Sequence, residues 1–154
     1  MDEKLRKQYE DLAKKHGLPR FEELDSEFQV SALEDVQLLL PEIIGKMLEK
    51  IQTYADFLGE ILQPDTNLVN LYESRVLGEP DKKEAYDVFR RLMMWKRRSL
   101  DVGLAGNPQA ESAFVAGLFA EWKALKPRLA GLVGKIADSW ESDSEEVEKL
   151  GYFG

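Results

Sequence analysis

Apolar side chains recur at the spacing of an α-helix along most of the chain, and this pattern constrains the fold more than any other feature. One apolar stripe runs in phase from residue 33 to 62, and another runs from 108 to 141. A repeat of three or four residues places such side chains on one side of a helix. The alternation typical of strands is missing, and so is any internal repeat. The sequence therefore predicts an all-α fold.

The breaks between the stripes predict a single-domain bundle of about five to six helices. Three of them should be long, at about 32–62, 81–102 and 108–141. Pro41 and Pro127 lie within two of these stripes without disturbing their phase. Because proline has no N–H and its ring clashes inside a helix, each is expected to kink a helix or to start one.

Local signals predict where several helices begin and end. Gly17 stands where a left-handed cap would close a first helix. Ser31 with Glu34 has the spacing of a capping box, which predicts the start of the first long helix. Asp65 or Thr66 is the expected cap of a shorter helix that reaches about Leu77.

The length of 154 residues suits one domain. We assign residues 1–141 to the helical domain and 142–154 to an acidic polar tail. The phase of the stripes predicts that Ile51, Leu118, Trp122 and Leu129 lie in the core.

Composition excludes several kinds of chemistry. The chain has no Cys and a single His, His16, which falls in the last turn of the first expected helix, where a cation complements the helix dipole. We therefore expect no catalytic residue, no metal site and no cofactor. The start of the chain is charged, and no apolar stretch approaches the roughly 20 residues that span a bilayer. These features predict a cytoplasmic protein that does not enter a membrane.

Charge is distributed unevenly along this chain of net charge −8. Residues 82–98 contain seven cations and two carboxylates. Five of the cations share one side of the expected helix: Lys83, Arg90, Arg91, Arg97 and Arg98. They form either a docking stripe for an acidic or phosphate-bearing partner, or a solvated face neutralised by carboxylates of the same chain. The acidic tail is one candidate cover for this stripe. The negative net charge disfavours nucleic acid.

Two further features of the long helices invite interpretation. Lys96 falls in an apolar arc that includes Leu100, so we expect it to form a buried ion pair or to extend its ammonium to water, with a catalytic lysine as the alternative. Small residues lie opposite the large ones of the last helix: Ala113, Gly117, Ala120, Ala124 and Gly131. This face either meets other helices of the same chain or is a self-association surface.

The sequence favours a soluble, non-enzymatic helical interaction protein, adaptor or scaffold-like, whose partner is another protein or a second copy in a homodimer. One alternative is a small-molecule-binding protein or enzyme with a polar pocket between helices. Another is a protein that binds an anionic partner through the Arg-rich helix face. A closed apolar core favours the first, and a cavity lined by converging polar groups favours the second.

Overall fold

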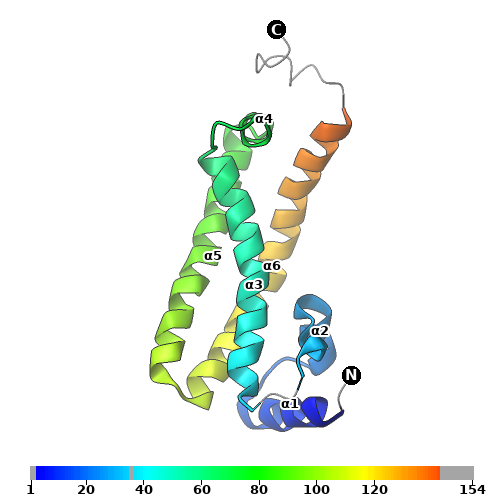
Figure 1. The fold of residues 1–154 in the computed structure, drawn as a ribbon, viewed down its shortest axis with the longest axis vertical. Helices are drawn as coiled ribbons and strands as arrows, with labels where there is room; N and C mark the ends of the chain where they lie inside the picture. The colour runs from blue at the N-terminus through cyan, green and yellow to red at the C-terminus, as the bar shows by residue number, and fades with distance from the viewer. Residues whose placement is uncertain (1–2, 35–36, 143–154) are drawn as a thin grey trace. The chain divides into compact units, whose positions relative to one another are not determined.

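The computed structural model describes residues 3–34 and 37–142 (Figure 1). Helices account for 86% of these residues, and no strand occurs among them. The elements in chain order are α1 (Glu3–His16), α2 (Phe21–Phe28), the 3-10 turn η1 (Val30–Ala32), α3 (Leu39–Leu62), α4 (Leu68–Val76), α5 (Glu79–Ala105) and α6 (Pro108–Glu141). The predicted all-α fold with three long helices is confirmed. Except for Ser142, the predicted acidic tail lies outside the described residues.

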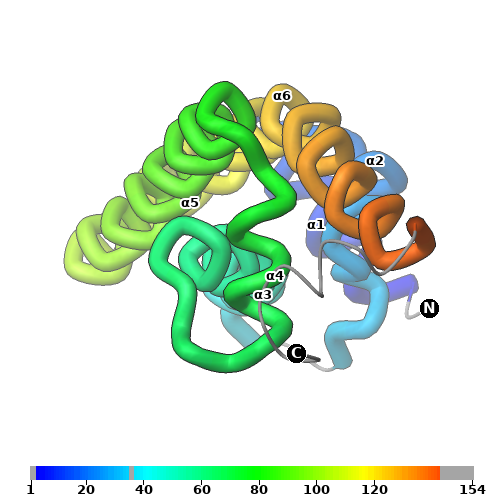
Figure 2. The backbone as a smooth tube through the Cα atoms, turned by 90° about the horizontal axis from the view of Figure 1, so that it is seen from above, coloured from blue at the N-terminus to red at the C-terminus, as the bar shows by residue number. Residues whose placement is uncertain are grey.

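The chain forms two compact units, and its three long helices contribute to both. The first unit comprises Met1–Gln52 and Met94–Lys123, and the second comprises Thr53–Met93 and Ala124–Gly154. The backbone of α3, α5 and α6 is continuous through these boundaries (Figure 2).

The first unit is built around α1, α2 and the adjoining parts of the long helices. Gly17 has φ of 70° and closes α1, with its N–H bonded to the carbonyl of Ala13 at 2.8 Å. The ring of Tyr9 meets that of Phe21 edge to face, with 5.5 Å between centroids. Further core residues of this unit are Leu24, Met47, Ile51, Phe114, Val115, Leu118 and Trp122. The predicted core positions Ile51, Leu118 and Trp122 are confirmed.

The second unit has its own apolar core and ties α4 to the end of α6. Tyr72 is buried and donates its hydroxyl to the carbonyl of Ser139 at 2.8 Å. The indole of Trp140 lies 4.1 Å from the Tyr72 ring, centroid to centroid, and donates to Glu73 at 2.9 Å. Core side chains from the four helical segments include Leu58, Ile61, Leu77, Val88, Leu92, Leu125, Leu129, Leu132 and Ile136. The prediction that Leu129 is buried is confirmed.

The first long helix starts later than predicted. The N–H of Ser31 is bound by the carboxylate of Asp25 at 2.7 Å, and η1 ends in extended backbone at Leu33. The prediction of a capping box at Ser31 is therefore wrong, and α3 begins at Leu39. This start places Pro41 in the first helical turn, where a missing N–H breaks no hydrogen bond. A start near residue 32 would have put Pro41 in the interior, at a cost of about 3 kcal/mol. Pro41 thus marks a helix start, as one alternative predicted.

Two other boundaries also differ from the sequence prediction. The cap of α4 is Asn67, whose side-chain oxygen accepts from the N–H of Asn70 at 2.9 Å, so the prediction of Asp65 or Thr66 is wrong. Pro127 lies inside α6 and does not start a helix. Its side chain is exposed, which lets the ring stand clear of the core.

Candidate docking surface

Helix α5 carries all five cations of the predicted stripe, and the structure divides them between the two units. Lys83, Arg90 and Arg91 belong to the second unit, and Arg97 and Arg98 to the first. All are exposed except Arg91, which is half-buried and has interaction partners. The helix opens with acidic Glu79 and Asp81 in its first turn, which complement the helix dipole.

In the second unit, carboxylates on α5 form hydrogen bonds with cations on α6. Arg128 donates to both Glu84 and Asp87, at 2.6 Å for Asp87. Lys135 donates to Asp81 at 2.7 Å. The hydrogen bond from Arg128 lowers the pKa of Glu84 and of Asp87, and burial opposes this shift in both. The carboxylate of Asp87 forms its hydrogen bond with α6, and the nearby charges of Arg90 and Arg91 in the stripe also lower its pKa.

The acidic first part of the chain also has other partners. Glu22 pairs with Arg6 and lies 4.0 Å from Arg20, and Glu27 lies 3.9 Å from Lys50. Within residues 3–34 and 37–142, Arg97 and Arg98 form no ion pair. Neither guanidinium group is therefore neutralised by an ion pair within this part of the chain.

The end of α5 in the first unit also exposes two large apolar side chains. Leu100 is 60% exposed and Leu104 is 87% exposed. They lie one helical turn apart and share a side of the helix with Arg97, whereas Arg98 lies on another side, two residues before Leu100. We call Arg97, Leu100 and Leu104 the α5 terminal surface.

The sequence placed the end of this helix near residue 102, but it continues to Ala105. Gly106 has φ of 60°, and its N–H bonds to the carbonyl of Val102 at 3.0 Å, so a left-handed glycine cap ends α5. This extension makes Leu104 a helical residue. Leu100, expected within the apolar arc, is exposed instead.

Comparisons of the chain with protein-family models, curated proteins and solved structures gave no match. The surface is therefore interpreted from its own chemistry. In the described part of the chain, no helix is both long and apolar enough to cross a membrane. The same residues contain no group of three or more Asp, Glu, His or Cys side chains placed to hold a metal ion.

Lys96 is half-buried in the first unit and is not enclosed in the core. No described carboxylate forms an ion pair with it, so the expected buried pair is not present among residues 3–34 and 37–142. Its long methylene chain can cover apolar surface while its ammonium reaches water, the other alternative that the sequence left open. The hydroxyl of Ser99 donates to the Lys96 carbonyl at 2.5 Å.

The small-residue face of α6 is mostly open in the single chain. Ala113, Ala120, Ala124 and Gly131 are exposed. Only Gly117 meets another helix closely, because a Cβ there would lie 2.8 Å from Cη2 of Trp95. The contact is with the aromatic ring of Trp95 on α5. Packing within the chain thus explains one of these five positions.

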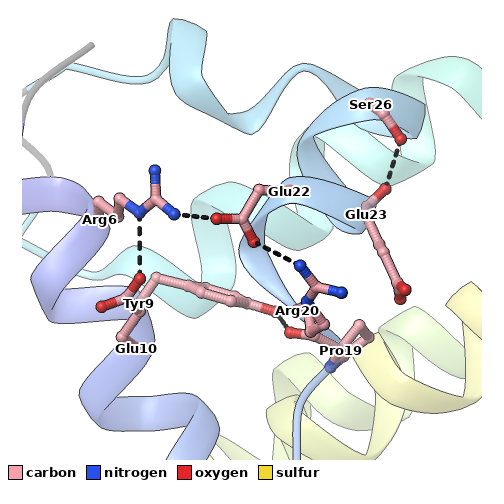
Figure 3. Close-up of polar contacts among 8 residues, drawn as sticks. All are labelled: Arg6, Tyr9, Glu10, Pro19, Arg20, Glu22, Glu23 and Ser26. Atoms are coloured by element: carbon pink, nitrogen blue, oxygen red, sulfur yellow. Dashed lines mark hydrogen bonds and ion pairs between the residues drawn. The ribbon is translucent and has the colours of Figure 1, made fainter.

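A surface pocket of about 440 Å³ lies beside α1 and α2 in the first unit, and the sequence did not predict it. Figure 3 shows the polar contacts around it. Arg6 binds Glu10 at 3.0 Å and also Glu22, so these charges compensate each other. Tyr9 donates its hydroxyl to the carbonyl of Pro19 at 2.6 Å, and burial raises the pKa of Tyr9 well above its ordinary value. Tyr9 therefore keeps its proton and is unsuited to act as a base.

A second unpredicted cluster holds α2 against α3 and α6. The ammonium of Lys50 lies 5.5 Å from the ring centroid of Phe28 and 5.4 Å from that of Trp122. The Glu27 carboxylate accepts from the indole N–H of Trp122 at 2.8 Å and lies 3.9 Å from the Lys50 ammonium. We call Glu27, Phe28, Lys50 and Trp122 the Lys50 clasp. Its cation–π contacts and ion pair give it a structural role.

Proposed function

We propose that this chain is a non-enzymatic interaction module whose α5 terminal surface binds an acidic, amphipathic segment of a partner protein. The observation that carries the proposal is the exposure of Leu100 and Leu104 on the side of α5 that also bears Arg97. Single exposed apolar residues are ordinary, but two leucines one turn apart form a contiguous apolar strip.

The composition of the surface specifies the partner's chemistry. Apolar side chains of the partner would cover the leucines, and its carboxylates would meet the forked donors of Arg97. Asp101 lies on the same face and removes part of the positive charge. The leucine strip favours protein over nucleic acid, and so does the net charge of −8. On the sequence grounds given above, the proposed setting is the cytoplasm.

The free energies of the individual interactions imply that the contact is weak and reversible. Complete burial of one leucine contributes about 1.5–3 kcal/mol, so the two partly exposed leucines would contribute roughly 2–4 kcal/mol together. Exposed ion pairs add about 0–1 kcal/mol each and weaken with salt. Association itself costs several kcal/mol. We therefore expect a dissociation constant of about 1 mM or higher for a short peptide.

The test uses a synthetic acidic peptide with leucines one turn apart and glutamates on both flanks. We expect salt-sensitive binding to the full chain by fluorescence anisotropy. The double variant Leu100→Ser/Leu104→Ser should lose it with an unchanged circular dichroism spectrum. The matched control is Val69→Ser on α4, an apolar position that is 51% exposed.

Three results would overturn the proposal. The first is equal binding by native protein and the double variant. The second is equal binding of a peptide whose glutamates are replaced by glutamine. The third is binding to phosphatidylserine vesicles that depends on the two leucines while the peptide does not bind, which would assign the surface to a membrane.

A further inference from the structure

The chain itself contains a segment with the chemistry that the α5 terminal surface requires. Residues 143–154 carry four carboxylates and one lysine, interspersed with four apolar residues: Val147, Leu150, Tyr152 and Phe153. The surface offers the complement, an arginine without an ion pair among the described residues and two exposed leucines. One polypeptide thus supplies both a basic apolar surface and an acidic apolar segment.

We infer that residues 143–154 of a second copy bind the α5 terminal surface, so that the protein self-associates by reciprocal exchange of these segments. This inference rests on the proposed function, because it names the partner of the same surface. The dimer is isologous, since the segment of each copy contacts the surface of the other.

Reciprocal exchange addresses the weakness of the individual contact. A pair of copies forms two contacts but loses translational and rotational freedom only once. The second contact is therefore effectively intramolecular and is governed by a local concentration that is commonly in the millimolar range. A surface too weak to hold a free peptide firmly is strong enough for a dimer under this arrangement.

The first measurement is sedimentation velocity of the full chain over a range of concentrations and salt. We expect a dimer that forms at low salt and weakens at high salt, because ion pairs contribute to each contact. Two full-length variants each remove one side of the contact. Leu100→Ser/Leu104→Ser removes the apolar receptor, and Glu145→Gln/Glu146→Gln/Glu148→Gln removes charge from the segment. Each should weaken dimerisation about tenfold or more, while Val69→Ser leaves it unchanged.

Mixing the two defective variants gives the sharper result. The leucine variant retains the native segment, and the glutamate variant retains the native surface. A pair made of one of each can therefore form one intact contact. We expect a heterodimer that is weaker than the native dimer and stronger than either variant alone. Failure of the mixture to associate more strongly than its components would overturn the exchange.

Other occupants predict different outcomes. Association that persists in both variants and is lost in Ala124→Glu would assign it to the small-residue face of α6. A chain that stays monomeric at all concentrations, and whose segment variant binds the synthetic acidic peptide more tightly, would mean that the segment covers the surface of its own molecule. A monomeric chain that binds the peptide overturns only the self-association, whereas loss of peptide binding as well overturns the proposed function.

Discussion

Replacing Gly117 by alanine tests how closely α6 packs against α5 in the first unit. The new Cβ would lie 2.8 Å from Cη2 and 3.4 Å from Cζ3 of Trp95. Carbon atoms are most stable at about 3.5–4.0 Å, so the indole must move. Its movement is opposed by an edge-to-face contact with Phe114, at 5.5 Å between centroids, and by a 3.3 Å hydrogen bond to Glu121.

The expected magnitude follows from two opposing effects. Alanine is better than glycine inside a helix by about 0.5–1 kcal/mol. Insertion of volume into a packed site destabilises by about 1–3 kcal/mol. Gly117→Ala should therefore change stability by between about zero and a loss of 2.5 kcal/mol. Gly131→Ala is the matched control, because nothing lies within 4 Å of its added Cβ, and it should stabilise by about 0.5–1 kcal/mol.

Urea denaturation followed by circular dichroism at 222 nm measures the difference. The free energy of unfolding should be about 1–3 kcal/mol lower for Gly117→Ala than for Gly131→Ala. Each kcal/mol of this difference corresponds to a change of roughly 2–4 °C in Tm. In a Trp95→Phe background the smaller ring removes the clash, and Gly117→Ala should stabilise as Gly131→Ala does. Equal stability of the two alanine variants in the native background would refute the close contact.

Two further predictions concern ionisable groups. Burial raises the pKa of Tyr9, so its stabilising contribution is complete below about pH 10 and is lost as pH rises further, by at most about 1.4 kcal/mol per pH unit. Urea denaturation at pH 8 and 11 should therefore show a smaller alkaline loss in Tyr9→Phe. The pKa values of Glu84 and Asp87 are lowered mainly by Arg128, so this stabilisation is present above about pH 4 and disappears as pH falls. Arg128→Gln should raise both pKa values in an NMR titration, whereas Lys135→Gln should leave them nearly unchanged.

Helix boundaries could be predicted where the deciding chemistry is local. Gly17 closes α1 through its own left-handed backbone, and Pro108 opens α6 where the sequence placed it. The prediction failed at Ser31 because Asp25, six residues earlier, binds its N–H. A capping box is recognised from the spacing of two nearby side chains. It does not reveal that another carboxylate, here that of Asp25, accepts a hydrogen bond from the same N–H group.

The candidate surface could be predicted only in part. The cations of α5 were identified from their helical spacing, but Leu100 was assigned to the apolar arc and is exposed. The apolar spacing predicts which residues share one side of a helix. How much of that side is buried depends on the length and position of the neighbouring helices, which the spacing does not reveal. The Lys50 clasp was missed because it joins segments of three helices, and no sequence pattern indicates that these segments pack together.

The Lys50 clasp has a consequence for synthesis on the ribosome. Glu27 and Trp122, which it joins, are 95 residues apart in the chain. At a translation rate of about 5–20 residues per second, α2 emerges roughly 5–20 s before the indole that will hold it. During that interval Phe28 has no Trp122 ring to cover it. The segment from Phe21 to Gly45 contains seven carboxylates and no Lys or Arg, and their mutual repulsion would keep nascent chains on one polysome apart until α6 arrives.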